Sequence, residues 1–140
     1  MTDHEASAPS LLIMAGAFIK RPGMFLGHPI RFDRATAFIS GYTLAIDQVR
    51  GALSPDHAQA FRPVGIEGQF QQQLREEGRL RWDRWDLTIA AEATNWTHDE
   101  PPVLDAFTDE QHLAAIAHLQ PLLDRVFALP GSFSPIEPTS

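Results

Sequence analysis

The chain has 140 residues, 44% of them hydrophobic, which fits one globular domain with its own core. It has no cysteine, so disulfides and thiolate metal sites are excluded, and no apolar run approaches the roughly 18 residues of a membrane span. The formal net charge of −7 is uneven, because residues 1–84 carry +1 whereas residues 85–140 carry −8. An acidic half repels phosphate backbones, so we expect no nucleic-acid binding. Without a membrane span, we expect a cytoplasmic protein that does not bind membranes.

The beginning of the chain is typical of a short helix followed by a loop. Residues 1–8 are polar and are expected to be loosely ordered, as are residues 132–140. A helix is expected from Ser10, its N-cap, to Lys20. Pro22 should end it, since the residue before a proline avoids the α region. We expect Met24 to Leu26 to form an anchored apolar loop.

The longest helical pattern in the chain starts at Asp33, an N-cap residue, and runs to Leu53. Gly41 lies inside it. Because a mid-helix glycine costs about 1 kcal/mol relative to alanine, we expect another backbone to approach closely there. The apolar residues recur at spacings of three and four, as in a helix packed on several neighbours: Ala35, Phe38, Ile39, Tyr42, Ala45, Ile46, Val49 and Leu53.

Two further helical patterns follow the central one. The first is amphipathic and should end at Gly78, a C-cap position. Its apolar residues are Phe61, Ile66, Phe70 and Leu74. The second is expected over residues 83–95, within a longer row of apolar residues at helical spacing: Trp82, Trp85, Ile89, Ala93 and Trp96.

A last helical pattern begins at Thr108, which forms a capping box with Gln111. Pro121 should kink this helix or break it in two, because it removes a backbone donor and clashes with the carbonyl of Ala117. Its apolar residues are Leu113, Ile116, Leu119, Leu122, Leu123, Val126 and Phe127. Together the patterns predict a single all-α domain over residues 1–140, with five or six helices around the helix of residues 33–53.

No catalytic, cofactor or metal motif emerges from the residue spacing. His112 and His118 are six residues apart, which does not place two ligands on one helix face. Ser40 precedes Gly41 without a G-x-S-x-G elbow, and a serine inside a helix usually bonds a backbone carbonyl. We therefore expect no enzyme activity, no cofactor and no metal.

Two segments carry a family resemblance. Arg21 to Gly27 reads RPGMFLG, and Phe38 to Tyr42 reads FISGY. This order resembles small bacterial immunity-type proteins of polymorphic toxin systems, which start with an RPGMYLG-like segment and carry an aliphatic-x-GY helix. The resemblance implies an all-α protein that binds a cognate toxin and inhibits it by occluding the active site.

The expected contact surface is acidic, because acidic groups would oppose a basic toxin domain. Trp82, flanked by arginines, has the composition of an interface hot spot, although aromatic residues at helical spacing more often form core. Acidic residues also suit helix N-termini, which is a competing structural explanation. The predicted partner-binding residues are Asp99, Glu100, Asp105, Asp109, Glu110 and Trp82.

Two alternatives stay open at this point. One is an enzyme of unrecognised type with a pocket between helices. The other is a structural or adaptor module that forms a homodimer, for which the tryptophan-bearing helix would supply the interface.

Overall fold

The computed structural model describes residues 18–53 and 65–127, and within these ranges all regular structure is helical. The predicted single all-α domain of five or six helices is confirmed, with six α-helices delimited in the described residues. Residues 18–20 are helical, whereas the rest of the predicted first helix, residues 1–8 and residues 132–140 lie outside the described ranges. The elements are α2 (Pro22–Leu26), α3 (Phe32–Leu53), α5 (Gly65–Glu76), α6 (Trp85–Ala93), the 3-10 turn η2 (Leu104–Ala106), α7 (Asp109–His118) and α8 (Gln120–Phe127).

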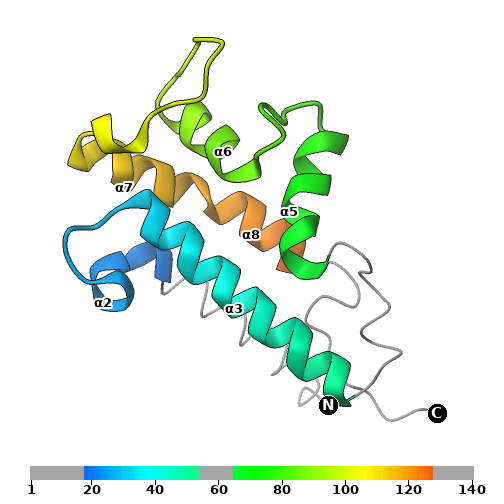
Figure 1. Ribbon diagram of the computed structural model, residues 1–140. Coiled ribbons are helices and arrows are strands. Elements are labelled where there is room, and N and C mark those ends of the chain that lie inside the picture. The colour runs from blue at the N-terminus through cyan, green and yellow to red at the C-terminus, as the bar shows by residue number, and fades with distance from the viewer. Residues whose placement is uncertain (1–17, 54–64, 128–140) are drawn as a thin grey trace, which may run out of the picture.

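The two longest stretches of helix lie against each other. Figure 1 shows α3 crossing the molecule, with α7 and α8 running behind it as one rod that is interrupted between them. α3 contacts α2, α5 and α7, while α6 packs on α7 and α5 packs on α8. The core therefore lies between the first half of α3 and the α7–α8 rod, and α5 and α6 close its remaining side.

The apolar stripe of α3 is buried only in its first half. Ala35 and Ile39 are in the core. Ala45 and Val49 were expected on the buried stripe, but both are exposed, Val49 to 56%. The stripe prediction is wrong there because, among the described helices, α2, α5 and α7 contact α3 and none of them covers this face. The Leu53 side chain lies outside the described ones.

The predicted apolar loop at Met24 to Leu26 is wrong, since these residues form the short helix α2. Pro22 occupies its first turn, where the missing N–H costs nothing and the fixed φ suits a helix. Met24 is 71% exposed, and Pro22 and Phe25 make the contacts instead. The Phe25 ring lies 6.1 Å from that of Phe18 in an edge-on arrangement.

The central helix starts differently from the prediction. Asp33 lies in its first turn rather than at the N-cap, and its carboxylate accepts hydrogen bonds from Arg31. The backbone N–H of Phe32, the first residue of α3, instead donates to Nδ1 of His112 at 3.0 Å. A side chain of α7 therefore caps α3, which sequence-local capping rules do not anticipate.

The close approach expected at Gly41 is also wrong, because a Cβ built there would meet nothing within 4 Å. The tight glycine is Gly65, which starts α5 with φ +70°. A Cβ there would lie 2.8 Å from Oδ2 of Asp47, and that oxygen accepts the N–H of Ile66 at 3.0 Å. Asp47 thus links α3 to the start of α5.

The end of α5 confirms the prediction at Gly78. Ile66, Phe70 and Leu74 are fully buried, as the pattern predicted, whereas Phe61 lies outside the described residues. Gly78 has φ +72° and donates to the carbonyl of Arg75. The next residue donates to the carbonyl of Leu74, which completes a Schellman motif.

The helix predicted over residues 83–95 covers only Trp85–Ala93. Trp82 and Asp83 both have left-handed backbone, with φ of 55° and 54°, so they form a turn that cannot belong to the helix. Asn95, also at positive φ, ends α6. Trp85 and Ile89 belong to the core, whereas Trp82 and Trp96 lie outside the helix.

The structure confirms both local predictions made for the last helical pattern, the cap at Thr108 and the break at Pro121. Thr108 and Gln111 form the reciprocal capping box of α7. The break at Pro121 separates α7 from α8, with Leu119 at the junction. Leu113 was expected in the core but is 44% exposed. The buried apolar residues of this segment are Ala115, Ile116, Leu119, Leu122, Leu123 and Val126.

Candidate functional site

The six predicted contact residues do not form one cluster. Asp105 forms an ion pair with Arg31 at 2.6 Å, and the same guanidinium also binds Asp33. The hydrogen bond from Arg31 holds the pKa of Asp33 below its usual value. Asp105 therefore belongs to an ionic bridge between η2 and the start of α3. This structural role explains the residue without a need for a binding protein.

Asp109 and Glu110 lie exposed in the first turn of α7. No hydrogen bond or ion pair of either side chain is found among the described residues. The positive end of the helix dipole favours acids at this position. A structural role therefore explains these two residues as well as an interface does.

Asp99 and Glu100 lie on the loop of residues 94–103, which projects from the bundle between α6 and η2 (Figure 1). Both are exposed, as are His98 and Pro101 beside them. Neither acidic side chain has an ion-pair partner in the described part of the chain. These two acids are exposed on a projecting loop.

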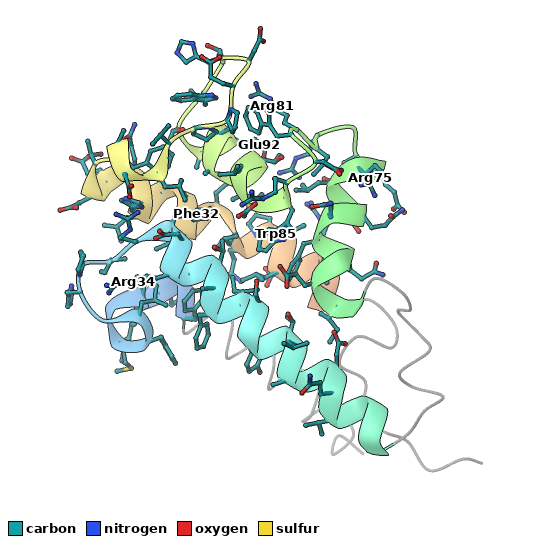
Figure 2. All side chains as sticks on the ribbon, in the orientation of Figure 1. Phe32, Arg34, Arg75, Arg81, Trp85 and Glu92 are labelled. Carbon is teal, nitrogen blue, oxygen red and sulfur yellow. The ribbon has the colours of Figure 1, made fainter. Side chains whose placement is uncertain are left out.

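The backbone of this loop is held by side chains. Arg81, which lies at its base in Figure 2, donates to the carbonyls of Trp96 at 3.1 Å and His98 at 2.7 Å. Nε1 of Trp82 donates to the carbonyl of Asp99 at 2.6 Å, and Nε1 of Trp96 donates to that of Glu100 at 2.8 Å. Four hydrogen bonds from three side chains thus order the segment that carries the acidic tip.

The turn that contains Trp82 is strained. Left-handed backbone costs roughly 1–2 kcal/mol for a residue with a side chain, and Trp82 and Asp83 adopt it consecutively. The Arg81 guanidinium lies 4.1 Å from the centre of the Trp82 ring, and Asp83 pairs with Arg75 at 3.1 Å. Such strain is concentrated at functional sites in folded proteins.

Trp82, predicted as an interface hot spot, also has a structural role in the fold. Its half-buried indole supports the loop by donating a hydrogen bond to the carbonyl of Asp99. The structure brings Trp82 together with Asp99 and Glu100. No hydrogen bond or ion pair among the described residues joins these three to Asp105, Asp109 or Glu110.

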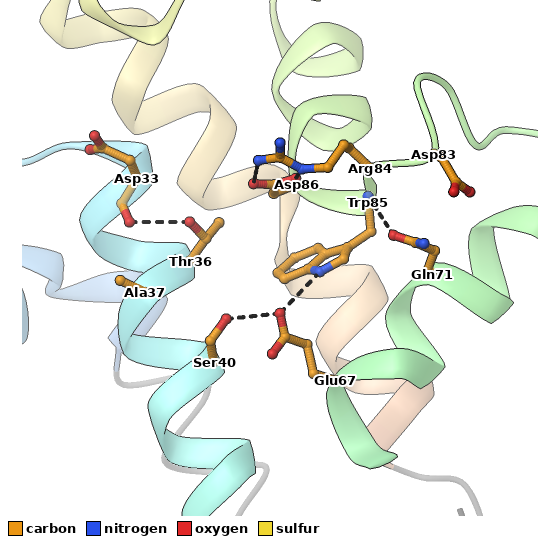
Figure 3. A pocket seen from close by; sticks show the side chains of 10 residues that line it. All are labelled: Asp33, Thr36, Ala37, Ser40, Glu67, Gln71, Asp83, Arg84, Trp85 and Asp86. Carbon is orange, nitrogen blue, oxygen red and sulfur yellow. Dashed lines mark hydrogen bonds and ion pairs between the residues drawn. The ribbon is translucent and has the colours of Figure 1, made fainter. Parts of the chain in front are cut away.

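A second feature is a groove of about 450 Å³ between α3, α5 and the start of α6 (Figure 3). The carboxylate of Glu67 projects into it from α5. Its Oε2 accepts hydrogen bonds from Oγ of Ser40 at 2.9 Å and from Nε1 of Trp85 at 3.4 Å. Gln71 accepts the backbone N–H of Trp85 at 3.2 Å. The remaining lining residues are Asp33, Thr36, Ala37, Asp83, Arg84 and Asp86.

From the sequence, the groove residues were not identified as a site. Ser40 was expected to bond a backbone carbonyl, whereas its hydroxyl donates to Glu67. Ser40 and Glu67 are 27 residues apart on two helices, so no local spacing connects them. The only usable signal was that Ser40 and Glu67 are polar residues next to buried apolar ones in their helices.

The groove does not assemble a recognisable catalytic set. Its lining contains a serine and carboxylates but no histidine. The described His112 and His118 bind Phe32 and Glu92 elsewhere. Among the described residues, no group of three or more potential ligands is placed to hold a metal ion.

The largest ionic network is structural. Arg79 binds the carboxylate of Glu92 with two nitrogens, at 3.0 Å and 2.5 Å, and also binds Glu77 at 2.6 Å. His118 adds a contact to Glu92 at 3.0 Å, and Arg125 adds one to Glu77 at 3.3 Å. Burial raises the pKa of Glu92, but the hydrogen bonds from Arg79 and His118 lower it by a larger amount, so the net shift is downward. The network ties α6, α7 and α8 to the end of α5.

No described helix combines the length and the apolar character that a membrane crossing requires. Comparisons of the chain with protein-family models, with curated proteins and with solved structures found no match.

Proposed function

We propose that this protein binds a basic toxin domain and inhibits it by occluding the active site, as an immunity-type protein does. The observation that carries the proposal is the acidic tip of the loop of residues 94–103, whose backbone is fixed by Arg81, Trp82 and Trp96. A projecting acidic element suits a protein partner with a positively charged surface.

The rigidity of the loop supports this proposal on energetic grounds. Fixing the backbone of a flexible residue on binding costs about 1–2 kcal/mol. A loop that is already ordered in the free protein avoids much of this cost. Residues that serve only solubility need no such support, because solvated charges gain nothing from a fixed backbone.

The charge of the chain supports the same partner class. Asp99 and Glu100 add to an acidic C-terminal half with a balance of −8. Opposite charges steer encounter and raise the association rate, and the effect weakens as salt is added. A basic partner would therefore associate quickly at low ionic strength.

The test begins with a toxin-like gene next to the gene for this chain. Its product is expressed in cells with and without this protein, and purified toxin domain is titrated into the protein by calorimetry. We expect rescue of growth, a saturable complex and loss of the toxin's activity in that complex. Growth arrest that the protein does not relieve, or no complex at low salt, would overturn the proposal.

Two charge-matched double variants locate the contact. Asp99→Asn with Glu100→Gln should weaken binding about tenfold or more and reduce its salt dependence. Asp109→Asn with Glu110→Gln removes the same charge from the start of α7 and should leave the affinity within a few fold. If only the α7 pair matters, the loop is not the contact.

A third variant tests the rigidity itself. Trp82→Phe keeps an aromatic ring but removes the donor to the carbonyl of Asp99. We expect weaker binding with both loop acids still present, and a larger loss of entropy on binding, measured by calorimetry. Unchanged binding would show that fixing the loop is unimportant for the complex.

A further inference from the structure

We infer that the groove between α3, α5 and α6 receives the guanidinium group of an arginine side chain from the protein partner. This inference rests on the proposed function and adds a second, more enclosed contact to it. Glu67 is the residue that would bind the guanidinium, with Trp85 and Ser40 as its fixed surroundings (Figure 3).

Among the described residues, Glu67 has no positively charged partner. Its hydrogen bonds come from the neutral donors Ser40 and Trp85. The two carboxylates of the ionic network, those of Glu77 and Glu92, each have an arginine. A half-buried charge without a counter-charge is costly, and a bound cation would remove that cost.

The charge around the groove points the same way. At its rim Asp83 is paired with Arg75 and Asp86 with Arg84. Arg31 serves two carboxylates, those of Asp33 and Asp105, so one negative charge remains there. With Glu67, two negative charges near the groove lack compensation in the described part of the chain.

The geometry favours guanidinium over other cations. The two donors occupy Oε2 of Glu67, which leaves Oε1 available to accept. A guanidinium is planar and weakly hydrated, carries several donors and lies well against aromatic rings. An ammonium group is more strongly hydrated and loses more on entering a half-enclosed groove. The volume of about 450 Å³ admits an arginine side chain with room to spare.

The probe is N-acetyl-arginine amide, which carries the side chain without a charged backbone. It is titrated into the full-length protein while the indole N–H signal of Trp85 is followed by NMR, with Trp85→Phe identifying the signal. We expect a saturable shift, a weaker one with N-acetyl-lysine amide, and none with the neutral citrulline analogue. No saturable shift with the arginine probe, or equal shifts with all three, would overturn the inference.

Variants assign the response to Glu67. Glu67→Gln keeps an acceptor for Ser40 and Trp85 but removes the charge, and it should weaken probe binding about tenfold or more. Glu76→Gln is the matched control, because Glu76 is an exposed acid of the same helix bonded to Gln72. Probe binding that survives Glu67→Gln, or that falls equally in Glu76→Gln, would contradict the assignment.

A gain-of-contact variant covers the case in which Glu67→Gln does not fold. Ser40→Arg places a guanidinium next to Glu67 from within the chain. We expect this variant to fold and to lose probe binding, because the groove is already filled. Undiminished probe binding in folded Ser40→Arg would place the cation elsewhere and overturn the inference.

The probe experiment contains no toxin, so its outcome is independent of the partner experiment. An absent probe response together with toxin inhibition that depends on Asp99 and Glu100 refutes the groove and leaves the proposed function intact. Probe binding without any toxin complex supports a guanidinium site but not a partner's arginine, and it points to a free cation such as agmatine. The inference as stated then fails.

Discussion

The junction between α3 and α7 should respond to pH through His112. His112 is only 4% exposed, and its Nδ1 accepts a hydrogen bond from the backbone N–H of Phe32 at 3.0 Å. Burial lowers the pKa of His112, the charge of Arg31 lowers it further, and Asp33 and Asp109 oppose the shift only in part. The folded protein therefore holds a neutral imidazole, the form that can accept this bond.

The direction of the pH effect follows from the lowered pKa. As the pH falls, the unfolded chain binds a proton at His112 before the folded chain does. The contribution of His112 to stability is therefore complete above about pH 6.5 and is lost as the pH falls below that value. The loss is at most about 1.4 kcal/mol per pH unit until the folded-state pKa is reached.

Two variants separate the bond from the titration. His112→Asn puts an amide oxygen near the position of Nδ1, so it can accept the bond but cannot titrate. We expect a flatter dependence of stability on pH in the acid range than in the wild type. His112→Leu keeps most of the volume but leaves the buried Phe32 N–H unpaired, which should cost about 1–3 kcal/mol at neutral pH.

The assay is urea unfolding followed by circular dichroism at a series of pH values, with the midpoint and the slope m compared between variants. His98→Asn is the control, because His98 is exposed on the loop. It should keep the wild-type pH dependence. If His112→Asn keeps it too, or if His112→Leu is as stable as the wild type, the assignment to His112 is refuted.

Further predictions use the same unfolding assay. Gly41→Ala should raise stability by about 1 kcal/mol, since the site is helical and nothing lies within 4 Å of the new Cβ. Gly65→Ala should lower it by roughly 1–2 kcal/mol or more, because φ is +70° and the Cβ would meet Asp47. Equal effects of the two alanines would contradict both accounts. Thr108→Ala should cost about 1 kcal/mol by removing the cap of α7, and no loss would mean that the capping box is dispensable. Glu92 has a lowered folded pKa, so its contribution is present above about pH 4.5 and is lost as the pH falls through the folded value. Glu92→Gln should therefore lower stability at neutral pH and weaken the acid dependence, and an unchanged acid limb would argue against that role.

Several features of the fold were predictable because their causes are local. The Thr108–Gln111 capping box and the break at Pro121 depend on residues within one helical turn of each other. Gly78 ends α5 because left-handed backbone costs glycine little. The buried face of α5 follows from residue spacing alone. Effects between residues that are close in the chain can be predicted from the sequence alone.

The errors occurred where a distant residue decides the outcome. Asp33 has the chemistry of an N-cap, yet His112, 80 residues away from Phe32, caps the helix. Gly41 looked like a packing point, but no neighbour reaches it. Trp82 and Trp96 keep helical spacing with Trp85, but the turn at residues 82 and 83 removes the first from the helix, and Asn95 ends the helix before the second.

The candidate site divides along the same line. Asp99 and Glu100 were identified by charge alone, whereas the support of their loop by Arg81 and Trp82 spans 17 residues and needed the fold. The uncompensated charge of Glu67 is likewise a property of three helices together.

By itself, the sequence determined an all-α chain, the positions of most helix ends and an acidic C-terminal half. These follow from residue spacing, from capping and turn residues, and from a count of charges. Only the tertiary structure decided which acids are paired, which tryptophans support a loop and which carboxylate has no counter-charge in the described part of the chain. The physical reason is that pairing depends on distances of about 3 Å between residues far apart in the chain, and packing alone sets those distances.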